Sequence, residues 1–185
     1  ARSLVRAGEG TEGRALLRRI AVMRGATTEV AANARFLLAD LASDDGQDRR
    51  ARDAYRALAK AYPRSRVANE SRFRAAIIAF ADGAHATAAR ELDSLAARDP
   101  RGEEALAAIY WSGRAWAAAG QTSRARERWR EVMRRNVASY YALTSARRLG
   151  ERPWMPPPAA DTVDTSSDEL LATAIRRLDV LSSLG

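Results

Sequence analysis

Apolar residues recur along the chain at spacings of three and four, the period of helices that bury one face. Leu106, Ile109, Gly113 and Trp116 form one such stripe. Runs of Val, Ile, Thr and aromatic residues bounded by turn signals, which would indicate strands, are missing from the sequence. The pattern predicts an all-α chain of about nine helices. Their expected ranges are 10–24, 28–43, 47–62, 67–82, 85–98, 102–119, 121–135, 138–149 and 167–183.

Three glycines mark a repeat of 37 residues along the chain. Gly46, Gly83 and Gly120 are evenly spaced, and an alanine follows each of them after five residues. A large side chain follows each alanine after four more residues. The matched positions are Ala51, Ala88 and Ala125, then Tyr55, Leu92 and Trp129. Pro63 and Pro100 each stand 17 residues after a glycine, where proline ends the second helix of a unit.

This spacing matches the A-x3-F…P half of the tetratricopeptide signature, in a unit three residues longer than the usual length of about 34. The residues at the W-x2-L-G-x2-Y positions of the third unit are Ile109, Ser112, Gly113 and Trp116. Ala39 and Ala76 stand at the glycine position of the earlier units and also allow close helix approach. We expect Trp116 to fill the space between paired helices. Residues 1–150 are therefore predicted to form one right-handed superhelix of tetratricopeptide-like repeats.

The character of the chain changes after Gly150. Residues 151–166 are predicted to be a linker, because the consecutive prolines within them hold polyproline-like geometry. Ser166 and Glu169 have the spacing of a capping box, and an apolar stripe follows them. Residues 167–185 are therefore predicted to form an amphipathic helix that leads towards a further domain.

The chain is strongly basic, with a formal net charge of +8 and 31 basic residues, of which Lys60 is the only lysine. This balance suits nucleic acid, anionic surfaces or acidic polymers without choosing among them. One basic stripe runs at helical spacing of i, i+4 and i+8. It consists of Arg126, Arg130 and Arg134. The stripe is either a solvated face or an anion-binding surface, and Glu127 and Glu131 are expected to pair with neighbouring arginines and weaken its field.

Tyr140 and Tyr141 stand close to Arg147 and Arg148, an arrangement that suits stacking on a sugar or a base. Alternatively, at least one of the tyrosines packs under the last repeat helix, since successive helical residues point in different directions. The candidate interaction surface therefore comprises the basic stripe and these two tyrosines.

The sequence contains little catalytic chemistry. It has no cysteine, and its single histidine, His85, follows Gly83-Ala84 at an expected helix start and is expected at the surface. Adjacent carboxylates occur at three places, where we expect them to stabilise helix starts or lie in loops. These pairs are Asp44-Asp45, Glu103-Glu104 and Asp168-Glu169. We predict no catalytic residue, no cofactor site and no metal site, and no apolar run approaches the roughly 20 residues that span a bilayer.

The final third of the repeat region carries a family resemblance. The chain reads Ile-Tyr-Trp-Ser-Gly-Arg-Ala-Trp from residue 109, and Val-Ala-Ser-Tyr-Tyr-Ala-Leu-Thr-Ser-Ala-Arg-Arg-Leu-Gly from residue 137. The matching positions are Tyr110, Trp111, Arg114, Tyr140, Tyr141, Leu143, Arg148, Leu149 and Gly150. Over roughly residues 103–185, the sequence resembles the end of the superhelical domain of periplasmic soluble lytic murein transglycosylases.

The resemblance implies a non-catalytic helical scaffold of a peptidoglycan-cleaving enzyme, located in the periplasm or cell envelope. In that family the catalytic glutamate stands in a Glu-Ser context within a later, lysozyme-like domain. The only Glu-Ser here is Glu70-Ser71, inside a repeat helix, so this chain alone is not expected to be an enzyme. The expected partner is a protein, a peptide or peptidoglycan.

Two other functions remain open at this point. A stand-alone envelope adaptor of tetratricopeptide type would bind a protein or peptide in its concave groove. The segment Tyr62-Pro63-Arg64-Ser65 resembles such adaptors. Nucleic-acid binding rests on charge alone and is the least favoured, because basic and aromatic residues do not interleave in a known binding motif.

Overall fold

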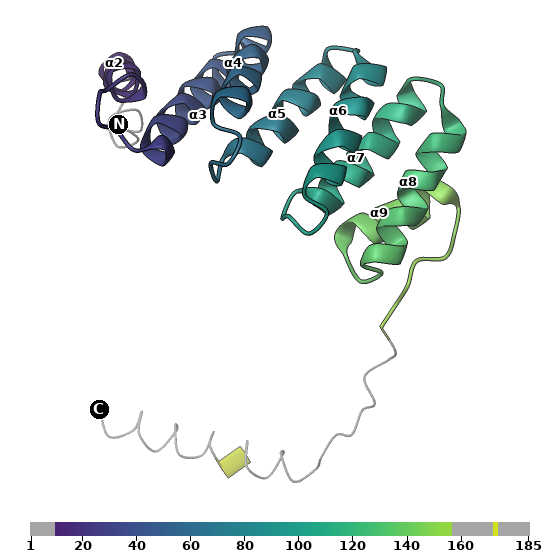
Figure 1. Ribbon diagram of the computed structural model, residues 1–185. Coiled ribbons are helices and arrows are strands. Elements are labelled where there is room, and N and C mark those ends of the chain that lie inside the picture. The colour runs from purple at the N-terminus through teal and green to yellow at the C-terminus, as the bar shows by residue number, and fades with distance from the viewer. Residues whose placement is uncertain (1–9, 157–171, 174–185) are drawn as a thin grey trace. The chain divides into compact units, whose positions relative to one another are not determined.

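The computed structural model describes residues 10–156, together with Ala172 and Thr173. In the first compact unit, which ends at Trp154, eight described helices follow one another in chain order (Figure 1). They are α2 (Gly10–Ala21), α3 (Thr28–Asp44), α4 (Asp48–Ala61), α5 (Ala68–Ala81), α6 (His85–Arg98), α7 (Ala105–Ala118), α8 (Thr122–Arg135) and α9 (Tyr140–Leu149). No strand occurs among the described residues, and the all-α prediction is confirmed.

The helices follow the 37-residue period to the residue. The second helices of the three units, α4, α6 and α8, begin at Asp48, His85 and Thr122. The first helices α5 and α7 begin at Ala68 and Ala105, in the same step. In the first unit, α3 ends at Asp44, which is 37 residues before the end of α5. It begins at Thr28, about one helical turn earlier than the period would place it. The units are therefore α3–α4, α5–α6 and α7–α8, with α2 before them and α9 after them.

Each glycine of the period lies between the two helices of a unit in the left-handed backbone region. The φ angles are 73° at Gly46, 81° at Gly83 and 77° at Gly120. The residue after each glycine donates its N–H to the carbonyl five residues earlier, at 2.8, 2.9 and 2.8 Å. This is the Schellman arrangement, which ends a helix and favours glycine because a Cβ is disfavoured at positive φ. The sequence period is therefore a requirement of the backbone.

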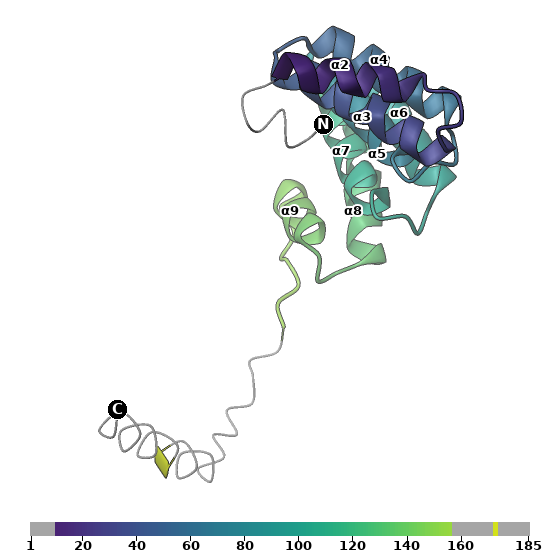
Figure 2. The same cartoon turned by 90° about the vertical axis from the view of Figure 1, so that its left-hand side faces the viewer.

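The first helices form the inner layer of the stack, and the second helices form the outer layer. Every helix packs against its neighbours in the chain, and α7 also contacts α5 and α9. Among the described helices, no comparable contact joins α4 to α6 or α6 to α8. Because α5, α7 and α9 approach one another more closely, they lie on the concave side. Figure 2 shows the row from its α2 end.

The core is built largely of alanine, which lets the helices approach closely. Ala51, Ala88 and Ala125 are completely buried, as the repeat pattern requires. Trp116 is also buried, and its indole Nε1 donates a hydrogen bond to Asp93 at 2.9 Å. Trp116 is therefore a core residue, as expected, and its hydrogen bond joins α7 to α6 of the preceding unit.

Several predicted helix ends shift by two or three residues. α2 ends at Ala21 rather than 24, and α7 begins at Ala105 rather than 102. α9 begins at Tyr140 because Ser139 caps it, its hydroxyl accepting the N–H of Ala142 at 3.0 Å. The predicted helix 167–183 lies outside the described residues except for Ala172 and Thr173, which are helical. None of the described helices is long and apolar enough to cross a membrane.

The expectation for the Asp44-Asp45 pair is only partly correct, because Asp45 lies in a turn but neither residue stands at a helix start. Asp44 is the last residue of α3 and Asp45 follows it, so both carboxylates lie at the negative end of the helix dipole. Arg14 of α2 offsets this with a two-pronged ion pair to Asp45, at 2.6 and 2.8 Å. The hydrogen bond from Arg14 also lowers the pKa of the Asp45 carboxyl. Asp45 therefore joins α2 to the end of α3 rather than starting a helix.

Candidate interaction surface

A continuous row of aromatic rings crosses three inner helices. It consists of Phe80 on α5, Tyr110 and Trp111 on α7, and Tyr140 and Tyr141 on α9, and is called here the aromatic strip. Successive ring centroids are 5.8 Å apart from Phe80 to Trp111, then 6.0 Å to Tyr110, 5.3 Å to Tyr141 and 5.6 Å to Tyr140. These spacings fall in the range of favourable aromatic pairs. The rings therefore hold one another in place.

The repeat places part of this strip automatically. Phe36, Phe73 and Tyr110 occupy the same position in the three inner helices, 37 residues apart. Each unit thus contributes one aromatic residue to the inner layer at the same helical register. The fourth such position, on α9, is Arg147.

Two arginines border the aromatic strip. The Arg114 guanidinium carbon lies 4.5 Å from the ring centroid of Trp111 and 5.5 Å from that of Phe80. Arg148 donates from Nε to the Tyr110 hydroxyl at 3.1 Å. Neither arginine forms an ion pair with a carboxylate within the described part of the chain. Ring contacts therefore position two guanidinium groups whose remaining donors suit a carboxylate or a carbonyl oxygen.

The rings of the aromatic strip differ in how much of their surface is exposed to solvent. Tyr110 is buried, Trp111 and Tyr141 are half-buried, and Tyr140 is 71% exposed. Burial, followed by the neighbouring Tyr140 and Tyr110, raises the pKa of the Tyr141 hydroxyl. Tyr141 is therefore neutral near pH 7 and presents a ring face with an uncharged donor. The surface offers apolar area together with hydrogen-bonding edges.

The inner face near α3 differs because its arginine is already neutralised. Arg74 binds Asp40 and, at 2.7 Å, Glu70, and the Tyr55 hydroxyl donates to Asp40. Burial and the hydrogen bond to Asp40 raise the pKa of Tyr55. A shallow pocket of about 230 Å³ lies beside this network, between α3 and α5. Its lining residues are Ser43, Tyr55, Phe73, Arg74, Ile77 and Ile78. Unpaired positive charge on the inner face is thus concentrated towards α9.

The structure places the predicted site residues on two separate layers. The stripe of Arg126, Arg130 and Arg134 lies exposed on α8, while Tyr140 and Tyr141 belong to the aromatic strip. Among the described residues, no ion pair, hydrogen bond or ring contact joins the stripe to the tyrosines. Tyr141 packs on Tyr110, which is the alternative that the sequence left open. Binding by the stripe stays a prediction.

The expected charge pairing around the stripe is only partly correct. Glu131 binds Arg135, as expected, and also Arg128. Arg130 instead contacts Glu151 at 3.5 Å, beyond the end of α9. The reason is that α9 folds back against α8, so residues after Gly150 reach Arg130.

The surface position expected for His85 was wrong. Its side chain is half-buried and its ring lies 5.2 Å from that of Phe80, because α6 begins directly behind the last turn of α5. Within the described residues, no group of three or more acidic, histidine or cysteine side chains is placed to hold a metal ion. Phe80 was not among the residues predicted for the interaction surface. The aromatic recurrence at positions 36, 73 and 110 was a signal that could have located the inner face.

Comparisons with known proteins agree with this architecture. The tetratricopeptide repeat family matches residues 33–65, which cover part of α3 and all of α4. No curated protein matches. A matching crystal structure contains the nearly identical TPR-like repeats of a Podosopora anserina protein described as a kinesin light chain. It is 17% identical, covers 100% of this chain and 93% of its own, and has a TM-score of 0.61.

The chain is thus a tetratricopeptide-like repeat domain with a superhelical, all-α fold. Domains of this class typically serve as non-catalytic scaffolds for protein interactions, because stacked repeats create an extended concave surface. Neither match concerns a transglycosylase, so the link to that family stays a prediction.

Proposed function

We propose that this chain is a protein-interaction scaffold that binds a segment of a partner protein along the aromatic strip. The observation that carries the proposal is the continuous ring contact from Phe80 to Tyr140, bordered by Arg114 and Arg148. A partner segment with apolar side chains would cover the rings. Its backbone carbonyls or a carboxylate would accept from the two guanidinium groups.

The packing within the strip favours binding. Aromatic and arginine side chains carry much of the energy in protein interfaces, partly because rigid rings lose little conformational entropy. Trp111 is held between Phe80 and Tyr110, and Arg114 lies over its ring. These side chains are therefore already ordered in the free protein, so they lose little further conformational entropy when a partner binds.

The scaffold is proposed to be non-catalytic. Cleavage of a glycosidic bond uses two carboxyl groups about 5–10 Å apart across a cleft. Three of the less exposed carboxylates are engaged in structural contacts between helices. Asp40 binds Arg74, Asp45 binds Arg14, and Asp93 binds Arg128 and Trp116. Purified chain incubated with murein sacculi should release no anhydromuropeptides, as measured by chromatography. Release that is lost on changing one carboxylate would contradict the proposal.

The parent protein is proposed to be a peptidoglycan lytic transglycosylase of the periplasm or cell envelope. Supporting this, Tyr110, Trp111, Arg114, Tyr141 and Arg148 carry the family resemblance and lie together in or beside the aromatic strip. In that role the strip would hold a partner protein or peptide while another domain cleaves the wall. The coding sequence beyond Gly185 tests the assignment. A lysozyme-like domain with a Glu-Ser motif is expected, and its absence would favour the stand-alone adaptor.

The binding function is tested with peptides selected from a random library displayed on phage. Trp111→Ala and Arg148→Gln should each weaken a selected peptide by at least about tenfold, since hot-spot residues dominate such contacts. Arg126→Gln, on the outer helix α8, is the matched control and should leave the affinity unchanged. Calorimetry measures all three. Equal affinity for the wild type and both strip variants would contradict the proposal.

A further inference from the structure

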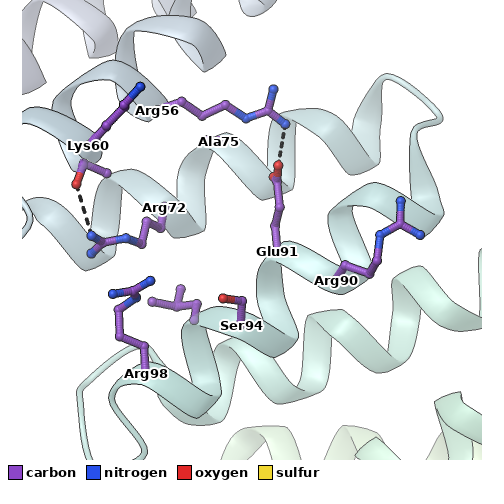
Figure 3. A pocket seen from close by; sticks show the side chains of 10 residues that line it. Arg56, Lys60, Arg72, Ala75, Arg90, Glu91, Ser94 and Arg98 are labelled. Carbon is purple, nitrogen blue, oxygen red and sulfur yellow. Dashed lines mark hydrogen bonds and ion pairs between the residues drawn. The ribbon is translucent and has the colours of Figure 1, made fainter.

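A second concave feature lies on the outer layer, between α4 and α6, and is called here the outer groove (Figure 3). It encloses about 430 Å³. Its floor is apolar and consists of Ala59, Ala75 and Leu95. Five cations and a single carboxylate surround this floor, together with Ser94. The charged residues are Arg56, Lys60, Arg72, Arg90, Arg98 and Glu91.

Most of this positive charge is not neutralised. Glu91 pairs with Arg56 at 2.6 Å, and no other ion pair forms in the groove among the described residues. Arg72 donates only to neutral acceptors, the carbonyl of Ala59 at 3.1 Å and the side chain of Asn69 at 2.8 Å. Burial, together with the neighbouring positive charge of Arg98, lowers the pKa of Arg72. Like charges therefore face one another across the groove.

The next repeat provides an internal comparison, because every lining position has an equivalent 37 residues later. The equivalents of Arg56, Arg90, Glu91, Ser94 and Arg98 are Asp93, Glu127, Arg128, Glu131 and Arg135. There, Arg128 binds Asp93 and Glu131, each at 2.9 Å, and Glu131 also binds Arg135 at 2.7 Å. The Arg56–Glu91 ion pair of the outer groove thus corresponds to the Asp93–Arg128 ion pair of the next repeat, with the two charges exchanged. The fold thus accepts a charge-balanced groove, and the cationic excess between α4 and α6 is not needed for packing.

The arrangement of the cations favours an extended ligand over a single small ion. Arg90 and Arg98 are eight residues apart on α6, which separates their backbones by about 12 Å along the helix axis. Their side chains also extend away from each other in Figure 3, so a single phosphate group would not contact both in this arrangement. An extended peptide rises about 3.3 Å per residue, so acidic side chains four residues apart match this separation. The apolar floor suits aliphatic side chains between them.

We propose that the outer groove binds an extended acidic peptide segment of a partner protein, with two carboxylates about four residues apart. The site is separate from the aromatic strip, and its recognition goes beyond the proposed function of the inner face. Lys60, Arg90 and Arg98 are exposed and supply the charge, while the half-buried Arg72 borders the apolar floor and donates to the carbonyl of Ala59. A scaffold with both sites would hold two segments at once, one on each layer.

The test uses a fluorescein-labelled peptide containing Glu-Ala-Leu-Ala-Glu, in which both glutamates and the leucine share one face of an extended strand, and the same peptide with glutamine at both glutamate positions. Fluorescence anisotropy with the whole chain, at about 50 mM salt, measures affinity. The variant carrying Arg90→Glu and Ser94→Glu reproduces the acidic residues of the next repeat, so it should fold normally. It should bind the acidic peptide at least about tenfold more weakly, because both changes place negative charge in the groove. Dichroism and thermal melting check its folding.

A matched control changes the same charge elsewhere. Ser123→Glu and Arg126→Glu alter two exposed positions on α8 and should leave the affinity unchanged. Glu91→Gln should raise the affinity severalfold, because it releases Arg56 from its carboxylate. Trp111→Ala should have no effect, which distinguishes failure of this site from failure of the aromatic strip.

Three results would overturn the proposal. Equal weakening in the α8 control would mean that the whole basic surface attracts the peptide. Equal binding of the glutamine peptide would show that the carboxylates are not recognised. Inorganic pyrophosphate that competes fully, and whose own binding is lost in the groove variant, would assign the site to a compact anion.

Discussion

Gly113 and Trp129 share one space at the centre of the third repeat. A Cβ on residue 113 would lie 2.6 Å from the indole Nε1 of Trp129, closer than any real contact. The two earlier repeats combine alanine at the first position with a smaller side chain at the second. These pairs are Ala39 with Tyr55 and Ala76 with Leu92. Glycine is therefore required in the third repeat because tryptophan occupies the facing position.

This relationship predicts a compensating pair of substitutions. Gly113→Ala should destabilise the chain by about 1–3 kcal/mol, because the added methyl group overpacks the core. Trp129→Leu alone should also destabilise it, by leaving a cavity. The double variant reproduces the Ala76–Leu92 pair and should recover at least about 1 kcal/mol relative to the sum of the single changes. Urea unfolding measures all three, and strictly additive effects would show that the residues are not in contact.

Trp116 should contribute more to stability than any exposed ring of the aromatic strip. It is buried and hydrogen-bonded to Asp93, so Trp116→Ala should cost about 3–5 kcal/mol through the cavity that it leaves. Tyr140→Ala serves as the control, because Tyr140 is 71% exposed, and it should cost far less. A loss below about 1 kcal/mol for Trp116→Ala in a denaturant titration would contradict its place in the core.

Tyr55 should make the chain sensitive to alkaline pH. Burial and the hydrogen bond to Asp40 raise its pKa in the folded protein, so folding favours the neutral phenol. The stabilisation is complete below the unfolded pKa of about 10 and is lost as pH rises above it, since the unfolded chain ionises first. Tyr55→Phe should therefore show a smaller fall in stability between pH 8 and pH 11. Urea unfolding at both values measures this, and an equal fall in wild type and variant would refute it.

The basic stripe on α8 makes a separate prediction. If Arg126, Arg130 and Arg134 bind anionic polymers, changing all three to glutamine should reduce binding while the helix remains intact. Sedimentation with sacculi and titration with duplex DNA, from about 50 to 200 mM salt, compare the two ligands. Loss on sacculi alone indicates wall targeting, and equal loss on both indicates a general basic surface. Unchanged binding to both would leave the stripe a solvated face.

The repeat architecture was predictable because its signals are local. Gly46, Gly83 and Gly120 are required by left-handed backbone turns, and each alanine of the period is required by close helix contact. These demands recur in every unit and therefore appear in the sequence as a fixed spacing. Helix starts were less predictable where the cap lies outside the period, as at Ser139.

The functional surfaces were less predictable because they combine residues from different units. Phe80 and Trp111 meet only because α5 and α7 lie side by side on the inner layer. The charge of the outer groove depends likewise on Arg72 and Arg98 facing one another across two helices. Periodicity identifies which positions are equivalent, but the substitutions that make one repeat differ from the next create the candidate sites.

The indole N–H signals of the tryptophans in a two-dimensional NMR spectrum report directly on binding along the aromatic strip. A peptide selected on the wild-type chain is titrated into uniformly ¹⁵N-labelled protein. Trp111 is half-buried in the strip, whereas Trp116 and Trp129 are buried in the core. The Trp111 signal is expected to shift progressively, while those of Trp116 and Trp129 should change little. Saturable binding with no change at Trp111 would contradict it.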